Sequence, residues 1–537
     1  MSTRDFDDSD LRQLQARGIT IDEVQHQLLC FERPPYFADV VRPCTIGDGI
    51  QRIAAEDCAE LLEIHARASA AGRLSSFVPA SGAATRMFAG LIAFHAVPPG
   101  DLPTWDQLRE AASRGDAASA EVVAFVRGAA RLPFRDALDS ELRPRGMSVE
   151  QASTGEGWRE LVAAVVSPER LGYARFPKAL VPFHRYPDGE VRTAFEEHLV
   201  EASELVREER GLCRLHFTVP EEHLDGFATL LREVGPRFTA RRKVAFDVGY
   251  SLQKPSTDTL AVDLEGRPFR TADGKLLFRP SGHGALIDNL EELEADVVLI
   301  KNIDNVRPED AIATTLRHRR LLTGLLVRLQ ASAFALLHRL KADRLADADL
   351  LAEAEAFVAR EFGAEPALAH RGGRRSREGR RAWLIERLDR PMRVCGVVPN
   401  TGEPGGGPFW VRDAQGLVAP QIVETAHIDP ESELRQRVLS SATHFNPVDL
   451  VCGLRDAGGR PYPLHSFLDT EAVFVGTKSA EGRPLRALER PGLWNGAMAG
   501  WNTVFVEIPL ETFAPVKSVV DLLRPEHQPG RGRQVRD

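Results

Sequence analysis

The stretch that decides the fold is Phe77-Val-Pro-Ala-Ser-Gly-Ala-Ala-Thr-Arg-Met-Phe88. It predicts a short apolar strand, a turn of small residues and the first turn of a helix, and such a turn presents backbone N–H groups to an anion. Ser81, Gly82, Ala83 and Ala84 have little or no side chain, so a phosphate can approach the main chain closely. Thr85 follows, and Arg86 adds a fixed positive charge. The alternative for this stretch alone is ordinary packing of a strand against a helix.

Length and composition bound the class of protein. A chain of 537 residues is too long for one core, so we expect several domains or one large α/β core with insertions. A net charge of −9 argues against a nucleic-acid partner. Six cysteines without a C-x-x-C pair indicate neither a disulfide framework nor a zinc ribbon. With an acidic N-terminus and no apolar run judged long enough for a bilayer, we expect a cytoplasmic protein without a membrane partner.

The apolar pattern divides the chain into four predicted regions. They are a helical N-terminal region (1–70), with helical spacing from Ile50 to Leu62, an α/β core (71–310) with a helical insertion at about 95–165, a helical region with a basic linker (311–390), and a C-terminal α/β region (391–537). The basic run at 371–381 is interpreted as a solvated linker or helix face, and a nucleic-acid patch is the alternative.

The predicted core combines strands and helices. Residues 212–219 and 242–252 alternate like strands, and residues 221–233 between them have a helical face, so we expect parallel strands. Val297 to Ile300 form a continuous apolar run, as in a strand buried on both faces. Long helices are expected at 311–340 and 347–362.

Two lysines stand in apolar segments bounded by proline. Lys178 lies in Phe-Pro-Lys-Ala-Leu-Val-Pro-Phe (176–183), and Lys517 lies in Phe-Ala-Pro-Val-Lys-Ser-Val-Val-Asp-Leu-Leu (513–523). An ammonium group in such a place can neutralise phosphate charge. For Lys178 the alternative is a surface lysine whose stem packs on apolar neighbours.

A carboxylate follows the predicted buried strand. Asp304, in Lys301-Asn-Ile-Asp-Asn305, comes at the carboxyl end of that strand, where open α/β sheets bind ligands. One carboxylate beside carboxamides suits Mg²⁺, which completes its shell with water and phosphate oxygens. The alternative is that Asp304 and Asn305 form a turn or cap the next helix. Asp469 and Asp247 are candidates for a second metal ligand.

Three further stretches suit a sugar or a base. Pro-Ser-Gly-His-Gly (280–284) is a second small-residue turn that can pack against a flat ring; its alternative is an ordinary helix start. Asn400 to Trp410 is too rich in glycine for a core element, so we expect Glu403 to line a sugar pocket, with a flexible surface turn as the alternative. Trp494 and Asn495 suit the stacking and hydrogen bonding of a polyol, with buried tryptophan packing as the alternative.

A group of polar residues follows Lys178 closely along the chain. They are predicted either to form a polar wall near the phosphates or to lie on a salt-bridged helix surface: His184, Arg185, Arg192, Glu196 and His198.

These motifs, in this order, resemble the UDP-sugar pyrophosphorylases. The shared phrases are Ser-Gly-Ala-Ala-Thr-Arg-Met (81–87), Pro-Lys-Ala-Leu-Val-Pro (177–182), Gln253 before Pro255, Pro-Ser-Gly-His-Gly (280–284), Asn-Ile-Asp-Asn (302–305) and the closing segment 515–523. The whole chain also resembles an uncharacterised bacterial family of unknown function, through Pro-Ser-Thr-Asp-Thr (255–259) and Pro-Gly-Leu-Trp-Asn-Gly-Ala-Met (491–498).

The resemblance implies an α/β nucleotidyltransferase core of the glycosyltransferase-A type, with a mixed, mainly parallel sheet flanked by helices. It implies the reaction of a nucleoside triphosphate, UTP favoured, with a sugar 1-phosphate or a related phosphorylated metabolite, giving an NDP-sugar and pyrophosphate. By the same resemblance, residues 81–86 hold the triphosphate and Asp304 binds Mg²⁺. Lys178 and Lys517 neutralise phosphate charge, while Gln253, Gly282, His283 and Gly284 face the base.

The chain departs from the family pattern in two places. Ser81 and Ala84 stand where the family has glycines, so the turn must avoid positive φ at both positions. Roughly ninety residues separate the first two motifs, which the family joins by a short loop. The alternative functions are a non-catalytic nucleotide-binding or scaffold protein, and a metal-dependent glycosyltransferase that uses Asn302-Ile-Asp304.

Overall fold

The computed structural model describes residues 6–98, 100–155, 157–343, 347–363, 376–403 and 405–530. The chain forms two compact units, each assembled from three separate stretches. The first unit comprises Met1–Phe77, Ser251–Ile300 and Arg320–Leu510, and the second comprises Val78–Tyr250, Lys301–Arg319 and Glu511–Asp537. The units therefore cut across the four consecutive regions predicted from the sequence.

The main sheet of the first unit is mixed and mainly parallel. Its strands follow the order β2-β3-β18-β12-β15-β11-β4. The β2–β3, β3–β18, β18–β12 and β11–β4 pairs are parallel, and the β12–β15 pair is antiparallel. The bounds are β2 Thr45–Ile46, β3 Gly49–Gln51, β18 Asn502–Glu507, β12 Met392–Pro399, β15 His444–Gly453, β11 Val297–Lys301 and β4 Leu74–Pro79. The α/β fold class is confirmed, and β11 is buried along its whole length, as its apolar sequence predicts.

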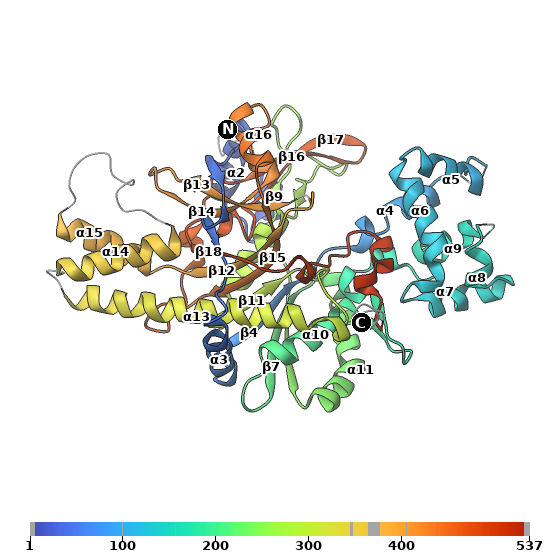
Figure 1. Ribbon diagram of the computed structural model, residues 1–537. Helices are drawn as coiled ribbons and strands as arrows, with labels where there is room; N and C mark the ends of the chain where they lie inside the picture. The colour runs from blue at the N-terminus through green and yellow to red at the C-terminus, as the bar shows by residue number, and fades with distance from the viewer. Residues whose placement is uncertain are drawn as a thin grey trace. The chain divides into compact units, whose positions relative to one another are not determined.

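Helices flank this sheet (Figure 1). The longest is α13 (Ala313–Ala342), which continues into the second unit at its N-terminal end. It crosses α3 (Asp57–Ala70) closely, because a Cβ at Gly324 would overlap the carbonyl of Leu61. Contrary to the sequence expectation, α13 is long and apolar enough to cross a membrane; 61% of its most apolar window is nevertheless buried inside the protein, as in a core helix.

Smaller elements complete the first unit. The antiparallel sheet β1-β13-β14 and the hairpins β9–β10 and β16–β17 each contribute apolar side chains to the cores of this unit. The bounds are α1 Asp8–Arg17, α2 Ile21–Glu32, β1 Val40–Pro43, β9 Thr259–Leu260, β10 Phe278–Arg279, α12 Leu286–Glu291, α14 Ala348–Phe362, α15 Arg377–Leu388, β13 Gly406–Arg412, β14 Val418–Glu424, α16 Glu433–Ser440, β16 Phe474–Ala480 and β17 Arg483–Glu489.

Two predictions for this unit are wrong and one is partly tested. Ile50 lies in strand β3 rather than in a helix, because Ile50 pairs with Ile46 and Phe505 in a sheet. In the Gly-rich stretch 400–410, residues 406–410 lie in the buried strand β13 and correct the prediction, whereas Asn400 to Gly402 are exposed and lie in no strand, as the surface-turn alternative expects. Of the basic run, residues 376–381 follow the helical prediction at the start of α15, and residues 371–375 lie outside the described part.

The second unit contains the predicted strand–helix–strand. Strand β7 (Leu212–Thr218), helix α11 (Leu224–Arg242) and strand β8 (Ala245–Ser251) follow one another, and β7 and β8 are neighbours in a sheet. A short hairpin, β5 (Pro182–Arg185) with β6 (Val191–Thr193), leads into helix α10 (Ala194–Leu205). The rings of Phe195, Phe217, Phe227 and Tyr250 contact one another and form the aromatic core of this unit.

The region predicted as a helical insertion is helical. After α4 (Ala89–His95) come α5 Trp105–Ser113, α6 Ala117–Gly128, α7 Arg135–Leu142, α8 Val149–Ala152 and α9 Trp158–Val166, which lie together (Figure 1). Helix α6 packs on the C-terminal segment of the same unit, since a Cβ at Gly128 would overlap the side chain of Leu523. The insertion therefore supports the segment that carries Lys517.

Candidate functional site

The turn after β4 is exposed and open. Ser81, Gly82 and Ala83 are exposed, and a Cβ at Gly82 would meet no atom within 4 Å. Neither Ser81 nor Ala84 has a positive φ, so the sequence expectation is confirmed and both residues fit without backbone strain. The predicted first turn of an α-helix is corrected: a 3₁₀ turn (Ala84–Arg86) follows, and α4 begins only at Ala89.

Hydrogen bonds tie this turn to the lysine motif despite the long insertion between them. The N–H of Ala84 donates to the Phe176 carbonyl at 2.8 Å, and the N–H of Lys178 donates to the Gly82 carbonyl at 3.1 Å. Ala84 is also fully buried, so its N–H is not available to a phosphate and its contribution is to shape the turn. The N–H groups of Gly82 and Ala83 make no hydrogen bond within the described chain.

Asp304 and both predicted lysines meet beside this segment. Asp304 is 7% exposed, and its Oδ2 lies 2.8 Å from Lys178 Nζ and 3.5 Å from Lys517 Nζ. Lys178 Nζ also donates to the Val516 carbonyl at 2.8 Å. Burial alone would raise the pKa of Asp304, but the two ammonium groups outweigh it and hold the pKa below its ordinary value. Asp304 is therefore a carboxylate held between two cations.

The backbone around Asp304 is fixed by the C-terminal segment. The N–H of Val516 donates to the Asp304 carbonyl at 3.0 Å, and the N–H of Ala514 donates to Asn305 Oδ1 at 2.9 Å. The predicted turn is present, because the N–H of Asn305 bonds to the Asn302 carbonyl at 3.2 Å. The carboxylate of Asp304 caps no helix and faces the lysines instead.

One oxygen of Asp304 suits a cation. Its Oδ1 is buried and has no hydrogen-bond partner. An unsatisfied buried carboxylate oxygen fits Mg²⁺, which needs one or two protein carboxylates and takes its other ligands from water and phosphate. Within the described residues, no group of three or more acidic, histidine or cysteine side chains could hold a metal. Asp469, which accepts a hydrogen bond from the Tyr36 hydroxyl at 3.0 Å, and Asp247 are not shown to join Asp304.

Thr85 and Arg86 complete the turn. Arg86 is exposed and makes no ion pair within the described chain. The hydroxyl of Thr85 donates to the Ala174 carbonyl at 3.2 Å. The guanidinium of Arg86 is thus free to bind an anion that arrives from solvent.

The first unit brings another set of predicted residues together. The rings of His283 and Trp494 stack with centroids 4.1 Å apart and planes 13° from parallel. The N–H of Leu493 donates to His283 Nδ1 at 2.9 Å, so Nδ1 is an acceptor and the ring proton lies on Nε2. That Nε2 lies 3.3 Å from Glu424 Oε1. Burial alone would raise the pKa of Glu424, but His283 and His427 lower it below its ordinary value.

The glycine turn and the tryptophan motif pack directly on each other. Gly282 has φ +75°, a conformation that favours glycine, and a Cβ at Gly284 would overlap the Pro491 carbonyl. Asn495 is buried, and its Oδ1 has no hydrogen-bond partner. A buried amide oxygen without a partner is suited to receive a ligand hydroxyl.

The remaining predicted residues are less well supported. Gln253 belongs to the first unit, and its Nε2 is buried without a hydrogen bond. Glu403 is half-buried in the first unit, and no described side chain pairs with it. Sequence reasoning missed Glu424, which is the last residue of β14 and pairs with Gly406.

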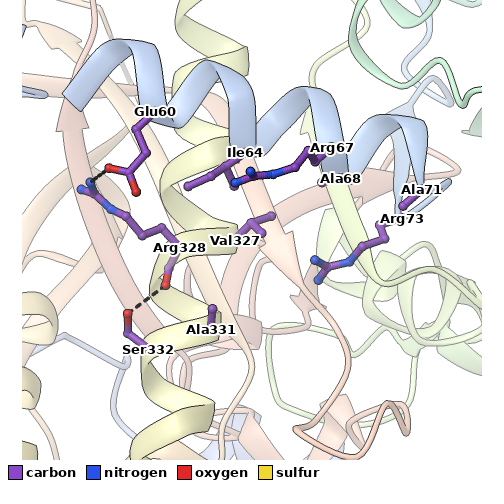
Figure 2. A pocket seen from close by; sticks show the side chains of 10 residues that line it. All are labelled: Glu60, Ile64, Arg67, Ala68, Ala71, Arg73, Val327, Arg328, Ala331 and Ser332. Carbon is purple, nitrogen blue, oxygen red and sulfur yellow. Dashed lines mark hydrogen bonds and ion pairs between the residues drawn. The ribbon is translucent and has the colours of Figure 1, made fainter. Parts of the chain in front are cut away.

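A groove of about 470 Å³ lies between α3 and α13 in the first unit (Figure 2). Three arginines line it, and each already has a carboxylate partner: Arg67 with Glu63, Arg73 with Asp296 and Arg328 with Glu60. The groove therefore offers no unpaired guanidinium to an anion, and we assign it no ligand.

A family model described as a domain of unknown function (DUF4301) matches residues 7–528. The chain belongs to the DUF4301 family. This confirms the predicted membership of a family of unknown function. Among curated proteins, none matches this sequence.

Several solved structures resemble the DUF4301 chain at low identity. They include a UDP-glucose phosphorylase of Trypanosoma brucei (13% identity, TM-score 0.44, covering 96% of this chain and 77% of that one) and the UDP-glucose pyrophosphorylase of Leishmania major (11%, 0.43, 96% and 77%). Another is the uridine diphosphate N-acetylglucosamine pyrophosphorylase of Trypanosoma brucei (11%, 0.47, 96% and 79%). These are members of the enzyme family that the sequence motifs resemble.

Proposed function

We propose that this DUF4301 protein is a nucleotidyltransferase that forms an NDP-sugar and pyrophosphate from a nucleoside triphosphate and a sugar 1-phosphate or a related phosphorylated metabolite. One observation carries the proposal: Lys178 and Lys517, distant in sequence, both approach the carboxylate of Asp304. Lys178 is also tied to the exposed turn at Gly82.

The charges of this group match what the reaction requires. The attacking group is an oxygen of the sugar phosphate, which is already anionic and needs no general base. The barrier comes from bringing two negatively charged phosphates together and from the charge of the leaving pyrophosphate. Lys178, Lys517 and Arg86 would offset this charge, and the N–H groups of Gly82 and Ala83 would orient the triphosphate.

Mg²⁺ is the proposed cofactor. Asp304 would hold it through the carboxylate oxygen that has no hydrogen bond. When bound, the ion would neutralise phosphate charge and polarise phosphate oxygens.

The first unit would supply recognition of the base and the sugar. The stacked His283 and Trp494, with Glu424 and the Asn495 amide, present a flat apolar face edged by hydrogen-bonding groups. Such a face suits a sugar ring or a planar base. Gln253 and Gly282 to Gly284 remain the proposed contacts to the base, with UTP favoured, and Glu403 remains a proposed contact to the acceptor.

The alternatives make different demands on the two lysines. Transfer of a glycosyl group requires no pair of lysines at the metal carboxylate, and a scaffold protein requires no catalytic group at all. The approach of both Lys178 and Lys517 to Asp304 therefore favours phosphate transfer over both alternatives.

The test is a release assay. The protein is incubated with each of the four nucleoside triphosphates, Mg²⁺ and a panel of sugar 1-phosphates, and pyrophosphate is measured, with a parallel arm in EDTA. We expect release with at least one pair, strongest with UTP, and none in EDTA. No release with any pair, together with no rise in melting temperature on adding a nucleotide, would overturn the proposal.

A further inference from the structure

Helix α10 is buried almost throughout, yet four of its buried side chains are ionisable. Eleven of its residues are buried, among them Glu196, Glu197, His198 and Glu201. Ionisable groups in such a place are costly unless each has a specific partner. Each of the four has a partner elsewhere in the second unit, so on α10 the predicted alternatives, a polar wall or a salt-bridged helix surface, give way to a buried network.

Two of these side chains hold the turn that carries Asp304. His198 Nε2 lies 3.3 Å from the Ile303 carbonyl, and because a carbonyl only accepts, the imidazole donates. Glu201 Oε1 lies 2.5 Å from Lys301 Nζ, and its Oε2 lies 3.2 Å from Arg319 Nη1. The residue before Asp304 and the end of β11 are thus both bound to α10.

Glu197 begins a chain of hydrogen bonds that ends in the C-terminal segment. Its Oε1 lies 2.9 Å from His184 Nδ1 and accepts from the Tyr186 hydroxyl at 2.7 Å. His184 Nε2 lies 3.1 Å from His527 Nδ1. Between the two rings, one nitrogen donates and the other accepts. Both imidazoles are fully buried.

We propose that α10 is the positioning element of the phosphate site. In this arrangement His198 fixes the turn that carries Asp304, and Glu197 acts through His184 to hold His527, which lies in the same C-terminal stretch as Lys517. None of these side chains touches the reacting groups, so their effect is on geometry. The proposal rests on the proposed function for its kinetic consequences, but the anchoring itself can be measured without activity.

The first test replaces His198. His198→Phe keeps a ring in the space but leaves the Ile303 carbonyl without its donor, whereas the amide of His198→Gln can still donate. We expect the Phe variant to lose about tenfold or more in kcat with KM changed less than threefold, and the Gln variant to recover most of that loss. His318→Phe is the matched control, because among the described residues His318 bonds only the Thr314 carbonyl of its own helix, at 3.0 Å.

The second test measures hydrogen exchange, which is independent of catalysis. His198→Phe should speed exchange at residues 302–305, and His527→Phe should speed it at 524–528, each at least tenfold over wild type and over His318→Phe. If His198→Phe does not fold, His198→Asn, whose amide is too short to reach the carbonyl, takes its place.

The outcomes separate the two proposals. Local increases in exchange with no transferase activity in the wild type would support the anchoring and reject the proposed function. Unchanged exchange in folded variants would overturn the anchoring, even if the enzyme is active.

Discussion

The two groups of predicted site residues use different physical means. In the second unit, two ammonium groups surround one carboxylate beside a bare backbone turn, so the chemistry there is that of charge. In the first unit, an imidazole stacks on an indole with one carboxylate at its edge, so the chemistry there is that of shape and hydrogen bonding. Charge acts most strongly where charge develops during reaction, while flat apolar surfaces bind ground state and transition state alike. We therefore expect variants of the second unit to change kcat and variants of the first unit to change KM.

Removing the carboxylate should have the largest effect. Asp304→Asn keeps the size of the side chain but abolishes its charge, so we expect pyrophosphate release to fall by about 10³-fold. A circular dichroism spectrum like that of the wild type would show that the loss is not unfolding. Activity within tenfold of wild type would remove Asp304 from the site.

Substitution of either lysine should have the next largest effect on activity. Lys178→Ala and Lys517→Ala should each lower kcat by about 10²-fold with little change in KM, since each removes one cation from the reacting phosphates. Lys478→Ala, at an exposed strand position, is the control. A rise in KM alone would show that the lysines act in substrate binding, like His283 and Trp494, and would contradict the expected difference between the two units.

Variants of the group around His283 and Trp494 should change KM rather than kcat. Trp494→Ala removes the stacking partner of His283, and we expect KM for the sugar phosphate or the nucleotide to rise by about tenfold at nearly constant kcat. Steady-state kinetics with each substrate varied in turn would show which of the two ligands this face binds. A fall in kcat without a change in KM would contradict the division.

The buried histidines predict how stability depends on pH. Burial lowers the pKa of His198 to about 4; Glu201 opposes the shift, and Lys301 and Arg319 add to it. The unfolded chain, with a histidine pKa of about 6.5, binds a proton that the folded chain excludes, so stability falls as pH drops from 7 toward 4. Urea unfolding at pH 7 and pH 5 should show that His198→Gln loses less stability than wild type on acidification, by about 1 to 2 kcal/mol. Equal losses would show that His198 is not buried neutral.

The smallest effect on activity is expected for a substitution in the turn after β4. Ala84→Gly should leave kcat within about twofold, because the Ala84 N–H bonds Phe176 and φ need not be positive. The buried methyl group is lost, so the melting temperature should fall, with a cost of about 1 kcal/mol. A gain in activity would indicate that the family glycine is needed there after all.

Much of the fold could be predicted where one physical signal dominates. The strands and helix at 212–251, the buried strand β11 and helices α13 and α14 all have regular apolar spacing, and the structure confirms each. The strand that contains Gly406 and Gly407 could not be predicted, because glycine at these positions reflects close packing rather than a loop. A Cβ at Gly406 would lie 2.8 Å from Ile422, and a Cβ at Gly407 would lie 2.8 Å from Phe409.

By itself, the sequence determined which residues we propose for phosphate chemistry: the small-residue turn at 81–86, Lys178, Asp304 and Lys517. Their side-chain types and local settings follow from short-range rules of backbone and charge. Only the tertiary structure decided that they meet, since Lys178 and Asp304 are 126 positions apart and their contact depends on the burial of many other residues. It also decided the role of α10, because the sequence cannot say whether a charged helix faces water or a core.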